Sequence, residues 1–354
     1  MKKVTIALVL LLLLITMGCK KDTAKEREDA SNDQMKQEEK SKENQDGLKH
    51  TYPFTGLQTT KSIDTRPVGV MINNHAKARP QSGLAQADIT FEILAEGNIT
   101  RFLSIFQSEQ PKVVGPVRSA REYYFELAKG YHALYIYHGA AKFVDQMIKD
   151  RSIEHLNGAI YDNDKVLFKR ESFRKAPHNS YLQYEAVEDT AEKLGYTMKD
   201  DLKPLPFLNE EESEHISGDA YKKAEIVYYK NPKTTVTYEY DATKEKYIRF
   251  SDGTKTIDME TEKPVELDNV FILETPHHIM DDAGRRKIDI QSGGQAYLLQ
   301  KGKVQKLQWK NDEGYILPVK DGKPIGFVPG KTWINIVPDN PGLKEEVTLS
   351  NESI

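Results

Sequence analysis

The pattern of apolar and polar residues divides the chain into a mixed part and a strand-rich part. Residues 67–74 (PVGVMINN) and 133–137 predict strands, because short apolar runs bounded by polar turns are typical of strands. Residues 140–148 and 182–194 predict helices, since apolar side chains recur there every three or four positions. Between residues 221 and 340 the pattern changes to short strand candidates separated by Asp-Gly, Gly-Gly and Pro-Gly turns. We therefore expect an α+β protein, with a mixed α/β N-terminal domain and a small all-β C-terminal domain, sandwich or barrel-like.

The same changes in pattern set the expected domain boundaries. Residues 51–199 form the N-terminal domain and residues 221–340 the C-terminal β domain. Residues 200–220, which contain two prolines and three consecutive glutamates, are expected to link them. Residues 341–354 are expected to form a tail.

Residues 88–106 (DITFEILAEGNITRFLSIF) predict a β-hairpin at the centre of the N-terminal domain. Gly97-Asn98 would be its two-residue turn, because glycine tolerates the positive φ that such turns require. That turn would pair Glu92 with Leu103 and place Glu92 and Glu96 on one face. Arg101 would lie diagonal to both carboxylates. The opposite face, rich in aromatic and β-branched residues, is expected to be buried.

The N-terminus predicts the compartment. A basic start is followed by an apolar segment, residues 4–17, which is too short to span a bilayer readily. The segment ends at Gly18-Cys19, and Cys19 is the only cysteine, which excludes a disulfide within the chain. The arrangement resembles a bacterial lipoprotein signal, which implies that residues 1–18 are removed and Cys19 is lipidated. The alternative is a plain secretory signal with a chance cysteine.

Residues 19–50 are expected to form the lipidated start and a disordered tether. They are almost entirely charged or polar and cannot bury enough apolar surface to fold. A flexible segment of this length has an r.m.s. reach of about 30 Å. The net charge is only −4, from 50 basic and 54 acidic side chains, which gives no support to nucleic-acid binding. No nucleotide or metal motif is recognised, so no cofactor and no metal are expected.

Glu92 and Glu96 are the first candidates for chemistry, as a pair of glycosidase carboxylates. Positions i and i+4 of a strand lie ~13 Å apart at ~3.3 Å per residue. Retaining glycosidases need about 5–5.5 Å between their carboxyl groups, and inverting enzymes about 6.5–9.5 Å. An arginine between the two would also hold both ionised, which suits a general acid badly. An ion-pair cluster with Arg101 is therefore favoured, and acid–base catalysis by one glutamate with His178 stays an alternative.

Arg118 and Arg121 form a second candidate site. The run Ser119-Ala120-Arg121-Glu122 predicts a capping box, with Ser119 as the N-cap of the following helix. Free N–H groups at a helix start, flanked by two guanidinium groups, would favour a phosphate or carboxylate. The internal Glu122 would satisfy part of that charge.

Polar loop residues form the third set of candidates. Asn74, His75 and Arg79 follow the first predicted strand, and His178 and Asn179 lie in the segment KAPHN. A histidine in such a loop can be a general base, can hydrogen-bond a ligand or can simply hold the loop in place. The sequence leaves these roles open.

Several longer runs resemble a known family. RPVGVMINNHAKARPQSGLAQADI, EGNITRFLSIF, GPVRSAR and KAPHN are similar to the YerB-type lipoproteins of Gram-positive bacteria, and GGQAYLLQKGKV and GKTWINIVP resemble the second part of their ectodomain. The resemblance implies an envelope location and a two-part domain of unknown function, without a catalytic assignment. Members often have Asp-Asn where this chain has Asn73-Asn74, and Gly-Gly in place of Gly97-Asn98. The first departure removes a carboxylate that could hold a metal.

Together these features predict a cell-envelope lipoprotein on the outer face of the membrane, with binding favoured over catalysis. Arg79, Arg118 and Arg121 would bind an anionic wall ligand, such as teichoic-acid phosphate or a peptidoglycan carboxylate, and the protein would support or regulate envelope processes. One alternative is a hydrolase or lyase acting on wall glycan. Another is a module that binds an envelope protein.

Overall fold

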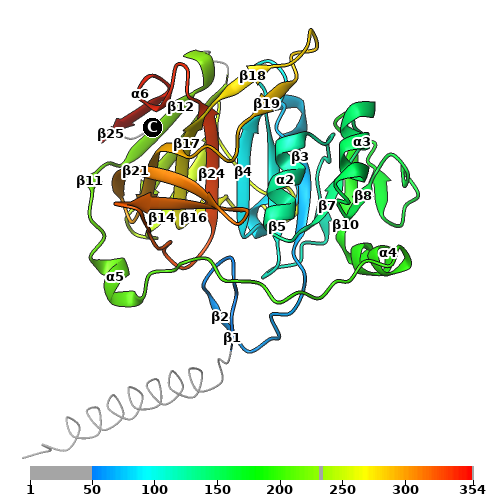
Figure 1. Ribbon diagram of the computed structural model, residues 1–354, viewed down its shortest axis with the longest axis horizontal. Helices are drawn as coiled ribbons and strands as arrows, with labels where there is room; N and C mark the ends of the chain where they lie inside the picture. Colours follow the sequence, from blue (N-terminus) through cyan, green and yellow to red (C-terminus); the bar gives the residue numbers. More distant parts are fainter. Residues whose placement is uncertain (1–49, 231–233, 353–354) are drawn as a thin grey trace, which may run out of the picture. The chain divides into compact units, whose positions relative to one another are not determined.

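The computed structural model describes residues 50–230 and 234–352 (Figure 1). The predicted signal peptide, Cys19 and nearly all of the predicted tether lie outside the described residues. The first strand begins at His50, one residue before the expected start of the N-terminal domain. Residues from His50 onward form one compact unit. No helix in the described ranges is long and apolar enough to cross a membrane.

A twelve-stranded mixed sheet is the framework of this unit. Strand β24 lies between β17 and β4 and is parallel to both, so strands from the two predicted domains are neighbours in one sheet (Figure 1). Across the sheet the order is β23 (Lys323–Pro324), β22 (Tyr315–Lys320), β21 (Lys303–Asp312), β20 (Gly294–Gln300), β17 (Asn269–Thr275), β24 (Thr332–Pro338), β4 (Ile89–Leu94), β5 (Thr100–Phe106), β3 (Val68–Asn73), β7 (Leu134–Tyr137) and β8 (His155–Asn157), with β11 (Asp219–Ala220) paired to β21.

Smaller sheets complete the β structure. The largest is a six-stranded sheet of β15 (Thr254–Lys255), β14 (Lys246–Ser251), β13 (Thr235–Asp241), β12 (Lys223–Val227) and β25 (Val347–Ser350), with β16 (Glu266–Leu267) paired to β14. The others are β6 (Val113–Val114), β10 (Ser180–Gln183) and β9 (Phe168–Arg170); the pair β1 (His50–Thr51) and β2 (Gln58–Thr59); and the pair β18 (His277–Ile279) and β19 (Arg286–Ile288).

The helices of the described ranges are short, and most of them lie before residue 200. The α-helices are α2 (Glu122–Gly130), α3 (Lys142–Asp150), α4 (Val187–Lys193), α5 (Glu210–Glu214) and α6 (Leu343–Glu346); the 3-10 helices are η1 (Ala76–Ala78), η2 (Leu84–Gln86), η3 (Tyr184–Ala186) and η4 (Tyr228–Lys230). The predicted capping box at Ser119 is wrong. Helix α2 begins two residues later than that box requires, and Arg121 occupies the N-cap without a side-chain cap.

The central strands β3, β4, β5 and β24 of the large sheet are buried on both faces, which explains their almost continuous apolar sequences. On one face Phe91 and Leu103 belong to a core that includes Leu127 of α2 and Ile148 of α3. On the other face the core is shared with the six-stranded sheet, which contributes Ile226, Tyr238 and Tyr247, and with Val187 of α4. The fold class is therefore confirmed as α+β with a strand-rich C-terminal part.

The hairpin register differs from the prediction by one residue. Glu92 pairs with Phe102 and Ile93 with Arg101, whereas Glu92 was expected opposite Leu103. The loop is longer than two residues, because the Ala95 N–H donates to the Ile99 carbonyl and the Ile99 N–H returns to Glu96. A slip of one residue reverses the faces of one strand relative to the other. Glu92 and Arg101 consequently lie on opposite sides of the sheet.

The C-terminal residues also differ from expectation. Residues 341–354 were predicted to be a tail, but they contain helix α6 and strand β25. Strand β25 pairs with β12 from Lys223–Ser350 to Ile226–Val347, so it is an edge strand of the six-stranded sheet. The predicted linker, residues 200–220, contains helix α5 and strand β11. The other domain boundaries remain predictions.

Candidate functional site

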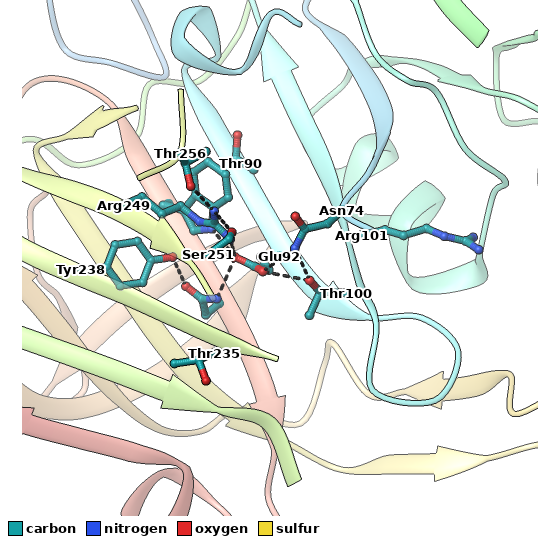
Figure 2. A network of polar contacts seen from close by, with 12 residues as sticks. Asn74, Thr90, Glu92, Thr100, Arg101, Thr235, Tyr238, Arg249, Ser251 and Thr256 are labelled. Atoms are coloured by element: carbon teal, nitrogen blue, oxygen red, sulfur yellow. Dashed lines mark hydrogen bonds and ion pairs between the residues drawn. The ribbon is translucent and has the colours of Figure 1, made fainter. Parts of the chain in front are cut away.

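Glu92 lies at the centre of a buried polar network between the two sheets (Figure 2). Its side chain is 0% exposed, so no solvent reaches the carboxylate. Both oxygens are used: Oε1 accepts from Asn74 Nδ2 (3.2 Å) and Thr100 Oγ1 (2.9 Å), and Oε2 from Arg249 Nη2 (2.8 Å), Trp333 Nε1 (3.0 Å) and Asn335 Nδ2 (3.2 Å). Five donors occupy both oxygens of this buried carboxylate, so it has neither a free oxygen nor an opening through which a substrate could reach it.

Arg249 is the counter-charge of Glu92, and its side chain is also 0% exposed. Nη1 donates to Ser251 Oγ and Thr256 Oγ1, both at 2.7 Å. The guanidinium lies 4.5 Å from the ring centroid of Trp333 and 5.1 Å from that of Phe102. Two desolvated charges are tolerated in a core only when they are paired and hydrogen-bonded, as here. This network joins strands that are 157 residues apart in the sequence.

Glu96, the second predicted carboxylate, belongs to a separate ion pair on the other side of the hairpin. It accepts from Arg101 Nη2 at 2.7 Å and from Arg121 Nη2. Arg101 also donates to the carbonyl of Ser119 at 2.9 Å, and Figure 2 shows its side chain pointing away from Glu92. The structure therefore contains the predicted contact between Arg101 and Glu96, whereas the predicted contact between Arg101 and Glu92 is wrong. Arg101 contacts Glu96, while Glu92 has a different arginine.

Arg118 is the most weakly held arginine of the described part of the chain. It forms no salt bridge there, and its side chain donates one hydrogen bond among these residues, from Nη1 to the carbonyl of Pro177 at the long distance of 3.5 Å. Its Nε is buried without a partner among these residues, as are the Nε atoms of Arg121, Arg249 and Arg286. Burial, and then repulsion from Arg101, lowers the pKa of Arg118 to about 10. The guanidinium thus stays charged at neutral pH while it lacks a counter-ion.

His75 and His178 lie beside Arg118, and their rings stack with centroids 4.7 Å apart. Asn73 Nδ2 lies 2.8 Å from His178 Nδ1, and Asn73 Oδ1 accepts from the His75 N–H, which orients the amide so that it donates to His178. The Lys77 N–H donates to His75 Nδ1 at 3.1 Å. Both Nδ1 atoms therefore accept, so each neutral ring carries its proton on Nε2. Both histidines present an N–H donor.

The pKa values of these two histidines support the neutral form. Burial lowers the pKa of His75, and nearby Lys77 and Arg118 lower it further. Burial also lowers the pKa of His178, followed by the effects of His75 and Arg118. At neutral pH the cluster of His75, Arg118 and His178, which we call the Arg118 cluster, therefore combines one full positive charge with ring N–H donors.

His138, Ser180 and Arg170 extend the Arg118 cluster and were not singled out in the sequence. Ser180 Oγ lies 2.8 Å from His138 Nδ1, which suggests a serine nucleophile and its base. However, Arg170 Nη2 lies 3.3 Å from His138 Nε2, and a guanidinium can only donate. The proton of the neutral ring must then lie on Nδ1 and point at Ser180. His138 consequently cannot take the proton of that serine.

The topology explains why these distant residues meet. Strands β3, β7 and β8 are mutually parallel, so their carboxyl ends lie at one edge of the sheet. Asn73 ends β3, and His138 directly follows β7. The backbone N–H of His138 donates to the carbonyl of Arg118 at 3.0 Å. Ligands of α/β sheets commonly bind outside the carboxyl ends of strands, and this rule could have identified His138 from the predicted strand ending at Tyr137.

The remaining predicted residues are fixed by neighbours. Arg79 forms a salt bridge with Asp252 and donates through Nε to the Oδ1 of Asn74 at 3.1 Å. Asn179 accepts from Arg170 Nη1 at 2.9 Å. The described residues contain no group of three or more side chains able to hold a metal ion.

Comparisons with known proteins place the chain in a family. Residues 54–197 match the model described as "Protein of unknown function (DUF3048) N-terminal domain", and residues 224–334 match its C-terminal domain. "Putative lipoprotein YerB" of Bacillus subtilis (strain 168) is 47% identical over 288 residues, which are 81% of this chain and 86% of the relative. The crystal structure of YerB from Bacillus subtilis matches with a TM-score of 0.78 and 46% identity, covering 85% of this chain and 100% of that one. This chain therefore belongs to the DUF3048 family and is a homologue of a protein named as a lipoprotein.

Proposed function

We propose that this protein is a cell-envelope lipoprotein, anchored at the outer face of the membrane through Cys19, whose folded unit binds an anionic group at the Arg118 cluster. The observation that carries the proposal is the uncompensated charge of Arg118. Partial burial costs a guanidinium some of its hydration, and without a carboxylate no ion pair offsets that cost. A bound anion would supply the missing electrostatic attraction.

Two other arginines of the described ranges also lack a carboxylate partner, and they differ from Arg118. Arg174 donates to the hydroxyl of Tyr181 and the carbonyl of Pro80. Arg286 donates to Tyr229 and to the carbonyl of Gly97, and its side chain is buried. Each is held by two short or normal hydrogen bonds. Arg118 has one long contact, so most of its donors are available to a ligand.

The groups around Arg118 favour an oxyanion over a cation or a neutral ligand. His75 and His178 offer Nε2–H donors, and a metal could not bind those nitrogens without displacing the protons. Phosphate and carboxylate oxygens accept from guanidinium and imidazole N–H groups in strong, charge-assisted hydrogen bonds. Wall polymers that carry phosphate or carboxylate, namely teichoic acid and peptidoglycan, have the chemistry that this site requires.

Compared with the sequence-based site, this proposal moves the anion from the helix start to the strand ends. Arg121 and Arg101 already share Glu96, and Arg79 already pairs with Asp252. These arginines need no ligand to balance their charge. Glu92 is enclosed in the core, so hydrolysis of a wall polymer by Glu92 has no support from its surroundings.

Binding of the soluble unit (residues 50–354) to purified cell walls tests this proposal. We expect Arg118→Gln to weaken binding tenfold to hundredfold, because a hydrogen bond to a charged group contributes about 1.5–3 kcal/mol. Lys306→Gln, which removes the same charge from an exposed position of β21, is the matched control and should bind normally. Walls stripped of teichoic acid distinguish its phosphate from peptidoglycan carboxylates. Equal binding by the Arg118→Gln and Lys306→Gln variants would refute the site.

A further inference from the structure

A pocket of about 150 Å³ opens beside the Arg118 cluster, where the N-terminal and C-terminal parts of the sheets meet. His75 lines this pocket and also stacks on His178, so it belongs to both sites. A pocket of this size suits one small ring with its substituents and is too small for a folded protein segment.

The pocket has one apolar side. Ile99, Tyr228 and Val236 line it, and Ile99 is 41% exposed, so the pocket is accessible from solvent near this residue. Small-molecule pockets typically combine such apolar walls with a few placed polar groups. A sugar ring matches this asymmetry, because its C–H face is apolar and its rim carries hydroxyl groups.

The polar side offers both a donor and an acceptor. Arg79 and Asp252 line the pocket and hold each other in an ion pair. A carboxylate has about four acceptor positions and a guanidinium five N–H donors, so the pair keeps capacity beyond its mutual contact. Adjacent hydroxyls of a sugar can both donate and accept, and they fit such a pair better than an alkyl group or a metal ion would.

The base of the pocket is rigid. Asn74 and Thr100 line it, and both donate to the buried carboxylate of Glu92. Asn74 also accepts from Arg79 through its Oδ1. The network around Glu92 thereby fixes the orientation of Arg79 before any ligand arrives. Groups that are ordered in advance lose less entropy on binding, which favours affinity for a small ligand.

From this arrangement we infer that the ligand is an anionic sugar: its ring occupies the pocket lined by Ile99, Arg79 and Asp252, and its phosphate or carboxylate reaches the Arg118 cluster across His75. This inference rests on the proposed function and adds the chemical class of the ligand. It assigns the central polar network a second role, as the support of a binding site.

Calorimetric titration of the folded unit with four probes tests the inference. The probes are inorganic phosphate, glucose, glucose 1-phosphate and glucuronate. We expect glucose 1-phosphate or glucuronate to bind at least tenfold tighter than phosphate alone, and the stronger of the two identifies the anionic group. Ile99→Trp, which fills the pocket from its exposed rim, should remove this advantage and leave phosphate affinity within twofold. Asp252→Asn retains the size of the side chain. It should reduce the advantage of the anionic sugar over phosphate without filling the pocket.

The outcomes separate the two proposals. If phosphate binds through Arg118 but neither anionic sugar binds more tightly, the sugar pocket is refuted and the anion site stands. The anionic sugar could also keep its higher affinity relative to phosphate in both the Ile99→Trp and the Asp252→Asn variant. The ring would then bind elsewhere, and the pocket would be refuted. If neither phosphate nor the anionic sugars bind, both proposals fail.

Discussion

Two arginine-centred regions of this protein show how similar residues serve different ends. Arg249 is fully enclosed, paired with Glu92 and surrounded by hydroxyl and aromatic groups. Arg118 is only partly buried, has one long hydrogen bond and forms no salt bridge within the described ranges. The first arrangement satisfies its charge internally and stabilises the fold. The second leaves charge unsatisfied near solvent, where a ligand can supply the missing partner.

The largest expected effect separates the two regions by cutting the chain. A fragment of residues 50–199 contains every residue of the Arg118 cluster but lacks Arg249, Trp333 and strand β24. It would expose the edge of β4 and the apolar face around Glu92, which would also lose its counter-charge, so we expect no cooperative unfolding transition. Circular dichroism during urea titration checks this. A fragment that unfolds cooperatively would show that the Arg118 region is an independent domain.

The second prediction breaks the buried pair. Arg249→Met should lower the free energy of unfolding by about 3–5 kcal/mol, because removal of one partner leaves an uncompensated buried charge. Arg285→Met at the partly exposed Arg285–Asp281 pair is the matched control and should cost less than about 1 kcal/mol. Urea denaturation measures both. Similar costs for the two variants would contradict the structural role of the Glu92 network.

The third prediction applies the same substitution to the other region. Arg118→Met should change the free energy of unfolding by no more than about 1 kcal/mol, because no carboxylate loses its partner. The same variant should lose the stabilisation that saturating sulfate gives to the unsubstituted protein. Thermal unfolding with and without sulfate measures both quantities. A loss of several kcal/mol without sulfate would mean that Arg118 is a structural residue.

The smallest expected effect is a pH dependence of anion binding. His75 and His178 have lowered pKa values and are neutral at pH 7, and a bound dianion would favour their charged forms. Proton uptake then accompanies binding, so sulfate affinity should rise as pH falls from 7 towards 5. We expect less than tenfold, since protonation of Nδ1 opposes the donors of Asn73 and Lys77. Replacement of both histidines by glutamine should abolish the trend, and calorimetry across this pH range detects it.

Stability should respond to acid in the opposite direction from sulfate binding. The folded-state pKa values of His75 and His178 lie below the ordinary value, so the unfolded chain binds protons that the folded chain does not. The contribution of these two histidines to the free energy of unfolding is present above their pKa in the unfolded chain. It is lost as pH falls through their lower pKa values in the folded chain. Urea titrations at pH 7 and pH 5 without anion provide the baseline for the binding experiment.

Much of the local structure could be predicted from the sequence. The strand over residues 67–74 became β3, and the apolar spacing of residues 140–148 became α3, because these patterns depend on neighbours along the chain. His75, Arg118 and His178 were all candidates, and the structure places them together. His138 was missed, since the parallel order of β3 and β7 brings it close to the end of β3. Ser180, which begins β10 of the separate three-stranded sheet, was missed because only tertiary packing brings it to His138.

The sequence by itself determined the family, the α+β class and the expectation of a lipoprotein signal, because motifs and periodicity are local. The tertiary structure decided which charges are satisfied. A hairpin buried on both faces has no polar alternation to fix its register, so a slip of one residue could not be detected and Arg101 was assigned to Glu92. The true partner, Arg249, is 157 residues away and is brought there by a second sheet. Only that long-range pairing shows which arginines have a carboxylate and that Arg118 has none within the described ranges.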